Sequence, residues 1–157
     1  MYKLNFDAAL YADLSTSGVG VIIRNDRGQV MVALLSKGGV VLDSEEAESL
    51  ACRKALEFAI DPSFSDLIVE GDNTNVMNSI TSGRSDLTRL GNIYDDIRCL
   101  AGCLRHVEFN SISCTVNGVA YSLARYAKQL GEDIVWLEDF PPLALEALYL
   151  ESISLSN

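Results

Sequence analysis

The chain has 157 residues, of which 48% are hydrophobic and 22% are charged, and this is the size and composition of one ordinary globular domain. Twelve basic residues stand against twenty-two acidic ones, so the net charge at pH 7 is −10. Affinity for nucleic acid comes largely from neutralising phosphates, so this negative net charge argues against a highly active nuclease.

The sequence also limits where the protein is expected. No apolar run approaches the length of a membrane span, and the first residues lack the basic start and apolar stretch of a secretory signal. We therefore expect a cytoplasmic or nuclear protein that is not secreted and has no membrane partner. Cys52, Cys99, Cys103 and Cys114 are widely spaced, mostly in apolar surroundings, which predicts reduced core thiols.

The first forty residues show the patterns of β-strands. Apolar and polar residues alternate over residues 4–10, which predicts a strand with Asp7 on the face opposite the apolar set. Residues 18–24 and 29–35 are two β-rich runs joined by a turn at 25–28 that contains Gly28, the pattern of a hairpin. The sequence predicts an opening meander of three antiparallel strands.

Helical spacing begins at Ser44, where an acidic first turn precedes about four turns of an amphipathic helix that carries Glu48. Residues 67–70 form a short apolar run that predicts a buried strand, with Asp72 at its C-terminal tip and a helix starting near Thr74. Sites on open α/β sheets usually lie at such strand tips.

The second half continues with a helix over residues 87–104, a strand over 106–113 and a helix over 116–130. The order predicts an α/β domain over residues 1–131. Residues 132–157 are expected to form a C-terminal tail, in which prolines 141 and 142 start a short apolar helix over 143–150. An apolar helix must bury itself, and we expect it to pack on the domain.

Three carboxylates are expected to converge: Asp7 within the first strand, Glu48 on the first helix and Asp72 at a strand tip. Oxygen ligands of this kind suit Mg²⁺ or Mn²⁺. Each residue also has a simpler interpretation. Asp7 is then a solvated strand residue, Glu48 an exposed helix glutamate and Asp72 a cap of the next helix.

Five segments in this order resemble the ribonuclease H-like superfamily, specifically the plant ribonuclease H-like domain related to reverse-transcriptase-associated sequences. The segments are residues 4–9 (Leu-Asn-Phe-Asp-Ala-Ala), 18–25 (Gly-Val-Gly-Val-Ile-Ile-Arg-Asn), 46–51 (Glu-Ala-Glu-Ser-Leu-Ala), 69–72 (Val-Glu-Gly-Asp) and 117–124 (Asn-Gly-Val-Ala-Tyr-Ser-Leu-Ala). The ending over 136–142 also looks like the tail of that family. The resemblance implies a mixed five-stranded sheet, three antiparallel strands followed by parallel ones, with flanking helices.

The resemblance also implies a function, the two-metal hydrolysis of the RNA strand of an RNA–DNA hybrid. By position, Asp7 would bridge both metals, and Glu48 and Asp72 would serve the metal at the leaving group. The family's fourth carboxylate, a ligand of the metal that activates water, falls at Tyr121. A phenol is neutral at physiological pH and longer than aspartate, so we expect catalysis to be impaired.

Other departures from the family pattern point the same way. Cys114 stands where the plant family usually has an arginine, and the loop before the last helix holds no histidine. The single histidine, His106, is predicted on a strand, as a structural residue. Arg53 and Lys54 are interpreted as solvated charges on the first helix.

The sequence leaves two hypotheses. Under the first, which we favour, the domain is a degenerate ribonuclease H, inactive or weakly active. It then acts by binding a protein or, against its net charge, RNA or an RNA–DNA hybrid. Under the second, three carboxylates hold enough metal for an active endonuclease that cleaves the RNA strand of hybrids. A basic, aromatic-lined groove beside the acids would favour the second, and a neutral or apolar patch the first. The first predicts weak or single-site binding of Mg²⁺ or Mn²⁺.

Overall fold

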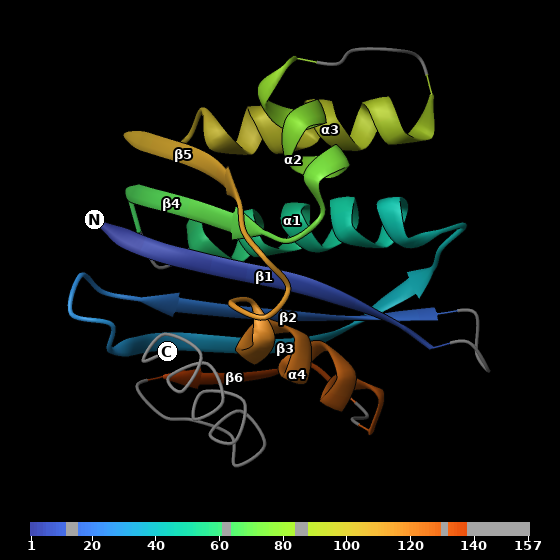
Figure 1. The fold of residues 1–157 in the computed structure, drawn as a ribbon, viewed down its shortest axis with the longest axis horizontal. Helices are drawn as coiled ribbons and strands as arrows, with labels where there is room; N and C mark the ends of the chain where they lie inside the picture. Colours follow the sequence, from blue (N-terminus) through green and yellow to red (C-terminus); the bar gives the residue numbers. More distant parts are fainter. Residues whose placement is uncertain (12–15, 61–63, 84–87, 130–131, 138–157) are drawn as a thin grey trace.

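The computed structural model describes residues 1–11, 16–60, 64–83, 88–129 and 132–137. Their strands form one mixed sheet of six strands in the order β5-β4-β1-β2-β3-β6 (Figure 1). The strands are β1 (Tyr2–Tyr11), β2 (Thr16–Arg24), β3 (Val30–Val40), β4 (Asp66–Gly71), β5 (His106–Ser111) and β6 (Ile134–Leu137). β2 pairs antiparallel with β1 and with β3, and β3 pairs antiparallel with β6. β4 is parallel to both of its neighbours, β1 and β5. The predicted mixed sheet is confirmed.

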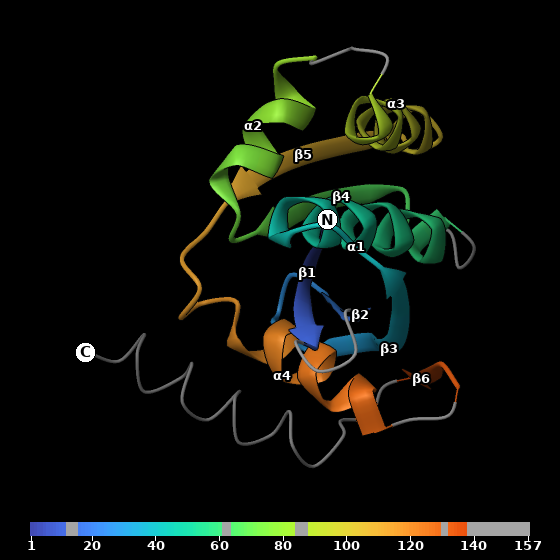
Figure 2. The ribbon, with the colours of Figure 1, turned by 90° about the vertical axis from the view of Figure 1, so that its right-hand side faces the viewer.

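Helices cover both faces of this sheet. The helices α1 (Ser44–Ile60), α2 (Thr74–Thr81) and α3 (Arg89–Ala101) share the larger core, to which β2 contributes Val21 and Ile23. The helix α4 (Gly118–Tyr126), followed by a 3₁₀ turn (Ala127–Gln129), packs on the other face, where Ile22 belongs to a second core (Figure 2). Successive strand residues therefore face opposite cores, as the pleat requires.

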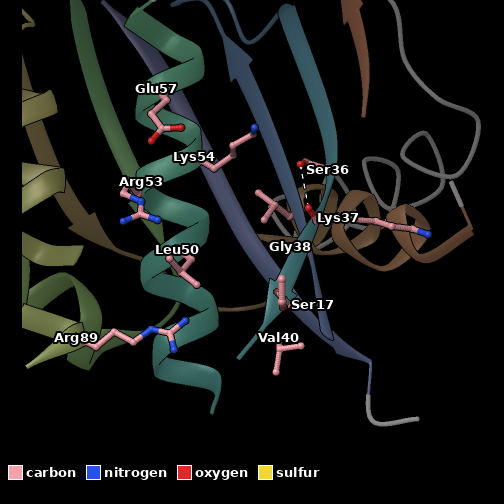
Figure 3. Close-up of a pocket in the computed structure, with 12 residues that line it drawn as sticks. Ser17, Ser36, Lys37, Gly38, Val40, Leu50, Arg53, Lys54, Glu57 and Arg89 are labelled. Atoms are coloured by element: carbon pink, nitrogen blue, oxygen red, sulfur yellow. Dashed lines mark hydrogen bonds between the residues drawn. The ribbon is translucent and has the colours of Figure 1, made fainter. Parts of the chain in front are cut away.

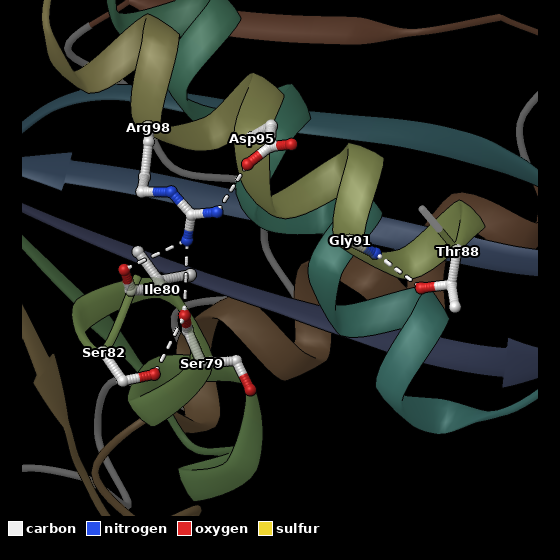
Figure 4. A network of polar contacts seen from close by, with 7 residues as sticks. All are labelled: Ser79, Ile80, Ser82, Thr88, Gly91, Asp95 and Arg98. Atoms are coloured by element: carbon white, nitrogen blue, oxygen red, sulfur yellow. Dashed lines mark hydrogen bonds and ion pairs between the residues drawn. The ribbon is translucent and has the colours of Figure 1, made fainter. Parts of the chain in front are cut away.

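Side-chain caps and cross-helix contacts fix the helices. Asp43 Oδ1 accepts a hydrogen bond of 2.9 Å from the backbone N–H of Glu46 at the start of α1. Thr88 caps α3 in the same way. Arg98 of α3 donates to carbonyls near the end of α2 and pairs with Asp95 at 2.6 Å (Figure 4). These contacts hold α2 and α3 together above β4 and β5.

The structure differs from the sequence prediction in its number of strands, six instead of five. Residues 134–137, which we assigned to the tail, form β6 and pair antiparallel with β3. A run of four residues is too short for a period-2 pattern to be distinctive, and its conformation depends on pairing with β3. The short apolar helix expected over residues 143–150 lies outside the described residues.

The prediction of four core thiols is wrong for three of them. Cys52 is buried, but Cys99, Cys103 and Cys114 are exposed, and all four are free. Cys103 follows the end of α3 and Cys114 lies in the loop before α4, where apolar neighbours in sequence do not ensure burial. Among the helices of the described residues, none is both long and apolar enough to cross a membrane.

Candidate metal centre

The three predicted carboxylates come together where β1, α1 and β4 meet. Asp7 lies in the middle of β1 opposite Gly20 of β2, Glu48 lies on the second turn of α1, and Asp72 follows β4 directly. Each side chain offers an oxygen atom that lies within 4.8 Å of those of the other two. Sequence positions 7, 48 and 72 thus converge on one point of the fold.

The simpler interpretations of these residues do not agree with the structure. Asp7 and Glu48 are only 3% and 7% exposed, so neither is a solvated surface residue. The cap of α2 is Asn73, whose Oδ1 accepts a hydrogen bond of 3.1 Å from the backbone N–H of Val76. Asp72 is therefore free of the capping role and points to the same place as the other two carboxylates.

Burial raises the pKa values of two carboxyl groups in this cluster. Desolvation raises the pKa of Asp7 and of Glu48 above their ordinary values, and the charge of neighbouring Asp72 raises both further. The backbone N–H of Ala8 donates to Asp7 Oδ1 at 2.9 Å and to Glu48 Oε1 at 3.2 Å. Glu48 Oε2 is buried without a hydrogen-bond partner. A hard cation would satisfy this oxygen and offset the like charges, so the donor set fits a divalent metal ion.

Sequence reasoning missed Asn117, which ties the cluster to α4. Its Nδ2 donates to the backbone carbonyl of Phe6 at 2.8 Å and reaches Asp72 Oδ2 at 3.5 Å, and its Oδ1 accepts from Asn5 at 3.3 Å. The side chain is 1% exposed and makes no capping bond to α4. An asparagine just before a helix is typical of a cap, so no signal in the sequence revealed this inward role.

Two glycines of β2 bring α4 close to Asp7. A Cβ atom at Gly20 would lie 2.1 Å from the carbonyl oxygen of Ala120, and one at Gly18 would lie 2.2 Å from that of Ala124. Only glycine permits this approach of helix backbone to strand backbone. The approach carries Tyr121, one residue after Ala120, to the mouth of the carboxylate cluster.

Tyr121 lines a cavity of about 430 Å³ together with Asp7, Glu48 and Asp72. Cys114 and Thr115, from the loop before α4, complete the polar part of its wall. The Tyr121 side chain is 42% exposed, and its hydroxyl accepts a hydrogen bond of 3.1 Å from Arg125 Nη1, one turn further along α4. The phenol is thus directed to Arg125 at the cavity mouth.

The cavity lacks two features of the expected catalytic groove. Among the described residues, no fourth carboxylate joins the cluster of Asp7, Glu48 and Asp72. No lysine or arginine of the described chain lines the cavity either, and Tyr121 is its one aromatic residue. His106 lies on β5 beside Glu108 and does not line it. The arrangement can hold one hard cation, but the described residues offer no carboxylate on the Tyr121 side for a second.

The fold is that of ribonucleases H. The chain aligns with a ribonuclease H1 of the halophilic archaeon Halobacterium salinarum at a TM-score of 0.74 and 22% identity, over 82% of this chain and 97% of the other. It aligns with an N-terminal ribonuclease H domain of Mycobacterium tuberculosis at a TM-score of 0.72 and 17% identity, over 82% of this chain and 93% of the other. The alignment with LC11-RNase H1 in complex with an RNA/DNA hybrid has a TM-score of 0.70 and 16% identity, over 80% of this chain and 94% of the other. LC11-RNase H1 was isolated from compost by a metagenomic approach.

These likenesses are all under 25% identity, so they show the fold alone. The family model described as reverse transcriptase-like matches residues 5–127, and the chain belongs to that family. No curated protein sequence matches the chain.

Proposed function

We propose that this chain is a ribonuclease H-like domain with an incomplete metal centre, which binds one divalent cation weakly and acts by binding, with little or no hydrolysis. The observation that carries the proposal is Tyr121. By the family pattern, the carboxylate that would hold the second metal falls at residue 121, and here that residue is a tyrosine whose hydroxyl is hydrogen-bonded to Arg125. Two-metal hydrolysis needs both ions, one at the attacking oxygen and one at the leaving oxygen.

The remaining carboxylates support the metal-binding part of the proposal. Asp7, Glu48 and Asp72 would hold one Mg²⁺ or Mn²⁺, which supplies a positive charge that neutralises buried carboxylates and a neighbouring phosphate. Asn117 and the N–H of Ala8 orient these carboxylates. Weak affinity is expected because buried Glu48 must lose its proton before it can bind the ion.

The second candidate function is an active endonuclease that cleaves the RNA strand of RNA–DNA hybrids. The close grouping of three acidic side chains favours it, and LC11-RNase H1, which has the same fold, forms a complex with an RNA/DNA hybrid. The net charge of −10 and the lack of a lysine or arginine among the described residues that line the cavity favour the first candidate.

Cleavage of a labelled RNA–DNA hybrid with Mg²⁺ or Mn²⁺ separates the two. The protein, Asp7→Asn and Tyr121→Asp are compared at equal concentration. We expect little or no cleavage by the unmodified protein and a gain in Tyr121→Asp, because the substitution restores a carboxylate where the second ion would lie. Efficient cleavage that disappears in Asp7→Asn would show an active nuclease and contradict the proposal.

A further inference from the structure

A free thiol lies on the wall of the carboxylate cavity. Cys114, in the turn that precedes α4, lines this cavity of about 430 Å³ together with Asp7, Glu48 and Asp72. Its side chain is exposed and forms no disulfide bond. Among the described residues, the ligand atoms that lie within 4.8 Å of one another come from the three carboxylates and do not include the sulfur atom. The thiol is therefore a neighbour of the metal centre that the three carboxylates do not include.

The three carboxylates form an incomplete ligand set for a small divalent cation. Each supplies one oxygen atom, whereas a Zn²⁺ ion takes four ligands in a tetrahedron. Glu48 lines the cavity and is 7% exposed, and its Oε2 is buried without a hydrogen-bond partner. A cation in the cavity would satisfy this oxygen. The ion then needs a fourth ligand from the rest of the wall or from water.

The rest of the described wall offers one strong donor. It consists of Ala8, Cys114, Thr115 and Tyr121. Ala8 presents a backbone N–H, which cannot bind a cation. The hydroxyl of Tyr121 accepts a hydrogen bond from Arg125, and the hydroxyl of Thr115 is neutral, so both are weak ligands. A thiol, in contrast, gives up its proton to a bound ion and coordinates as a thiolate. Cys114 is therefore the best fourth ligand on this wall.

Two hydrogen bonds fix the turn that carries Cys114. The backbone N–H of Asn117 donates to the carbonyl oxygen of Ser113 at 3.2 Å, and that of Val116 donates to Ser113 Oγ at 3.4 Å. Neither bond uses a group of Cys114, so its side chain can rotate among staggered rotamers while both bonds stay in place. The thiol can therefore adjust its position to an ion while the turn keeps its hydrogen bonds.

We propose that Cys114 coordinates the ion of this centre as a fourth ligand, so that the centre prefers Zn²⁺ to Mg²⁺. Mg²⁺ requires oxygen ligands in near-octahedral geometry, whereas a soft thiolate favours ions such as Zn²⁺. The hard ions gain least from sulfur, so their binding stays weak. This inference rests on the proposed function and deepens it, because it names the kind of ion that the incomplete metal centre takes.

The other thiols of the chain do not compete for this position. Cys52 is buried, and burial raises the pKa of its thiol, which the charge of Glu48 raises further. Cys99 and Cys103 are exposed, but neither lines the carboxylate cavity. Of the four cysteines, Cys114 alone lines it.

A second cavity, of about 290 Å³, lies between α1 and the C-terminal part of β3 and offers no comparable ligand set (Figure 3). Among the described residues that line it, Glu57 is the one carboxylate, and none is a cysteine or a histidine. Arg53 and Lys54 on its wall are already paired with Asp96 and Asp133. Of these two cavities, the carboxylate cavity alone combines acidic groups with a thiol.

The first test is a titration with Cd²⁺, a substitute for Zn²⁺ whose bond to a thiolate gives a charge-transfer band in the ultraviolet. Cys99→Ser/Cys103→Ser is the reference, because it removes the two exposed thiols that do not line the cavity. We expect the band in this reference and its loss when either Cys114→Ser or Asp7→Asn is added. A band that survives Cys114→Ser, or no band in the reference, would overturn the inference.

The second test compares Zn²⁺ and Mg²⁺ affinities of the unmodified protein and Cys114→Ser, with a chromogenic chelator as the competitor for Zn²⁺. Loss of an outer-shell partner alone costs about 10–100-fold in metal affinity, so loss of a ligand should weaken Zn²⁺ binding at least about tenfold. Mg²⁺ affinity is expected to stay the same. Equal Zn²⁺ affinities, or an equal loss for both ions, would contradict a sulfur ligand.

The two tests separate this inference from the proposed function. If the unmodified protein binds two Mg²⁺ ions tightly and Cys114→Ser still weakens Zn²⁺ binding, the proposed function fails and the assignment of Cys114 stands. If Mg²⁺ binding is weak and Cys114→Ser changes neither the Cd²⁺ band nor the Zn²⁺ affinity, the assignment of Cys114 fails alone.

Discussion

The two sides of α1 differ in sign, in burial and in how they are held. On one side, Asp7 and Glu48 are buried and fixed by backbone and amide donors. On the other, Arg53 and Lys54 are partly exposed and are held by surface ion pairs. A net charge of −10 therefore describes neither side. The comparison teaches that acidity can be concentrated at a buried centre while the opposite side of the same helix carries ion-paired basic side chains.

The largest contrast in stability is expected between substitutions of two glycines, Gly20 of β2 and Gly39 of β3. Gly20→Ala places a Cβ 2.1 Å from the carbonyl oxygen of Ala120, so α4 must move, and we expect the free energy of unfolding to fall by about 3 kcal/mol. Gly39→Ala, near the end of β3, places a Cβ with no atom within 4 Å and should change the free energy of unfolding by less than about 0.5 kcal/mol. Chemical denaturation measures both, and equal effects would refute the close approach of α4.

Two glutamates on opposite sides of α1, Glu48 and Glu57, test how burial affects the pH dependence of stability. Burial raises the pKa of Glu48 above its ordinary 4.5, so above that pH the unfolded chain loses the proton first and stability falls as pH rises. Glu48→Gln removes this penalty, and we expect a gain on the order of 2 kcal/mol at pH 8 that shrinks toward pH 4.5.

The matched control is Glu57→Gln, which changes an exposed residue on the side of α1 opposite Glu48. It should change the free energy of unfolding by less than about 0.5 kcal/mol at every pH. Both variants are measured with a chelator present, so that no metal ion contributes. A gain in stability for Glu48→Gln that does not depend on pH would argue against a raised pKa of Glu48 in the folded protein.

The smallest effect is expected for Tyr121→Phe. It removes one exposed hydrogen bond, to Arg125, and should cost less than about 0.5 kcal/mol. Because we assign the phenol no role as a ligand, affinity for Mn²⁺ should stay the same. A clear drop in a Mn²⁺ titration would mean that the hydroxyl contributes to the centre.

Much of the fold could be predicted from sequence because its signals are local. Alternation in β1, the turn after β2 and the helical spacing after Ser44 each depend on neighbouring residues. The grouping of Asp7, Glu48 and Asp72 followed from the order of these elements and from the family resemblance. β6 was missed because its four residues become a strand only by pairing with β3.

Features that depend on tertiary contacts could not be predicted in this way. Gly20 looks like any strand glycine until α4 lies on it, and Asn117 looks like a cap until it reaches Phe6. Arg53 pairs with Asp96 of α3 and Lys54 with Asp133, and neither pairing can be predicted from the spacing of charges along the chain. Sequence shows runs of charge, whereas folding gathers charges from separate elements.

The most direct test of the account counts metal ions by isothermal titration calorimetry with Mg²⁺ and with Mn²⁺. We predict at most one weak site in the unmodified protein, no binding in Asp7→Asn, and a second site in Tyr121→Asp, because that variant supplies the fourth carboxylate. Two tight sites in the unmodified protein would contradict the account, since the centre would then be complete despite Tyr121.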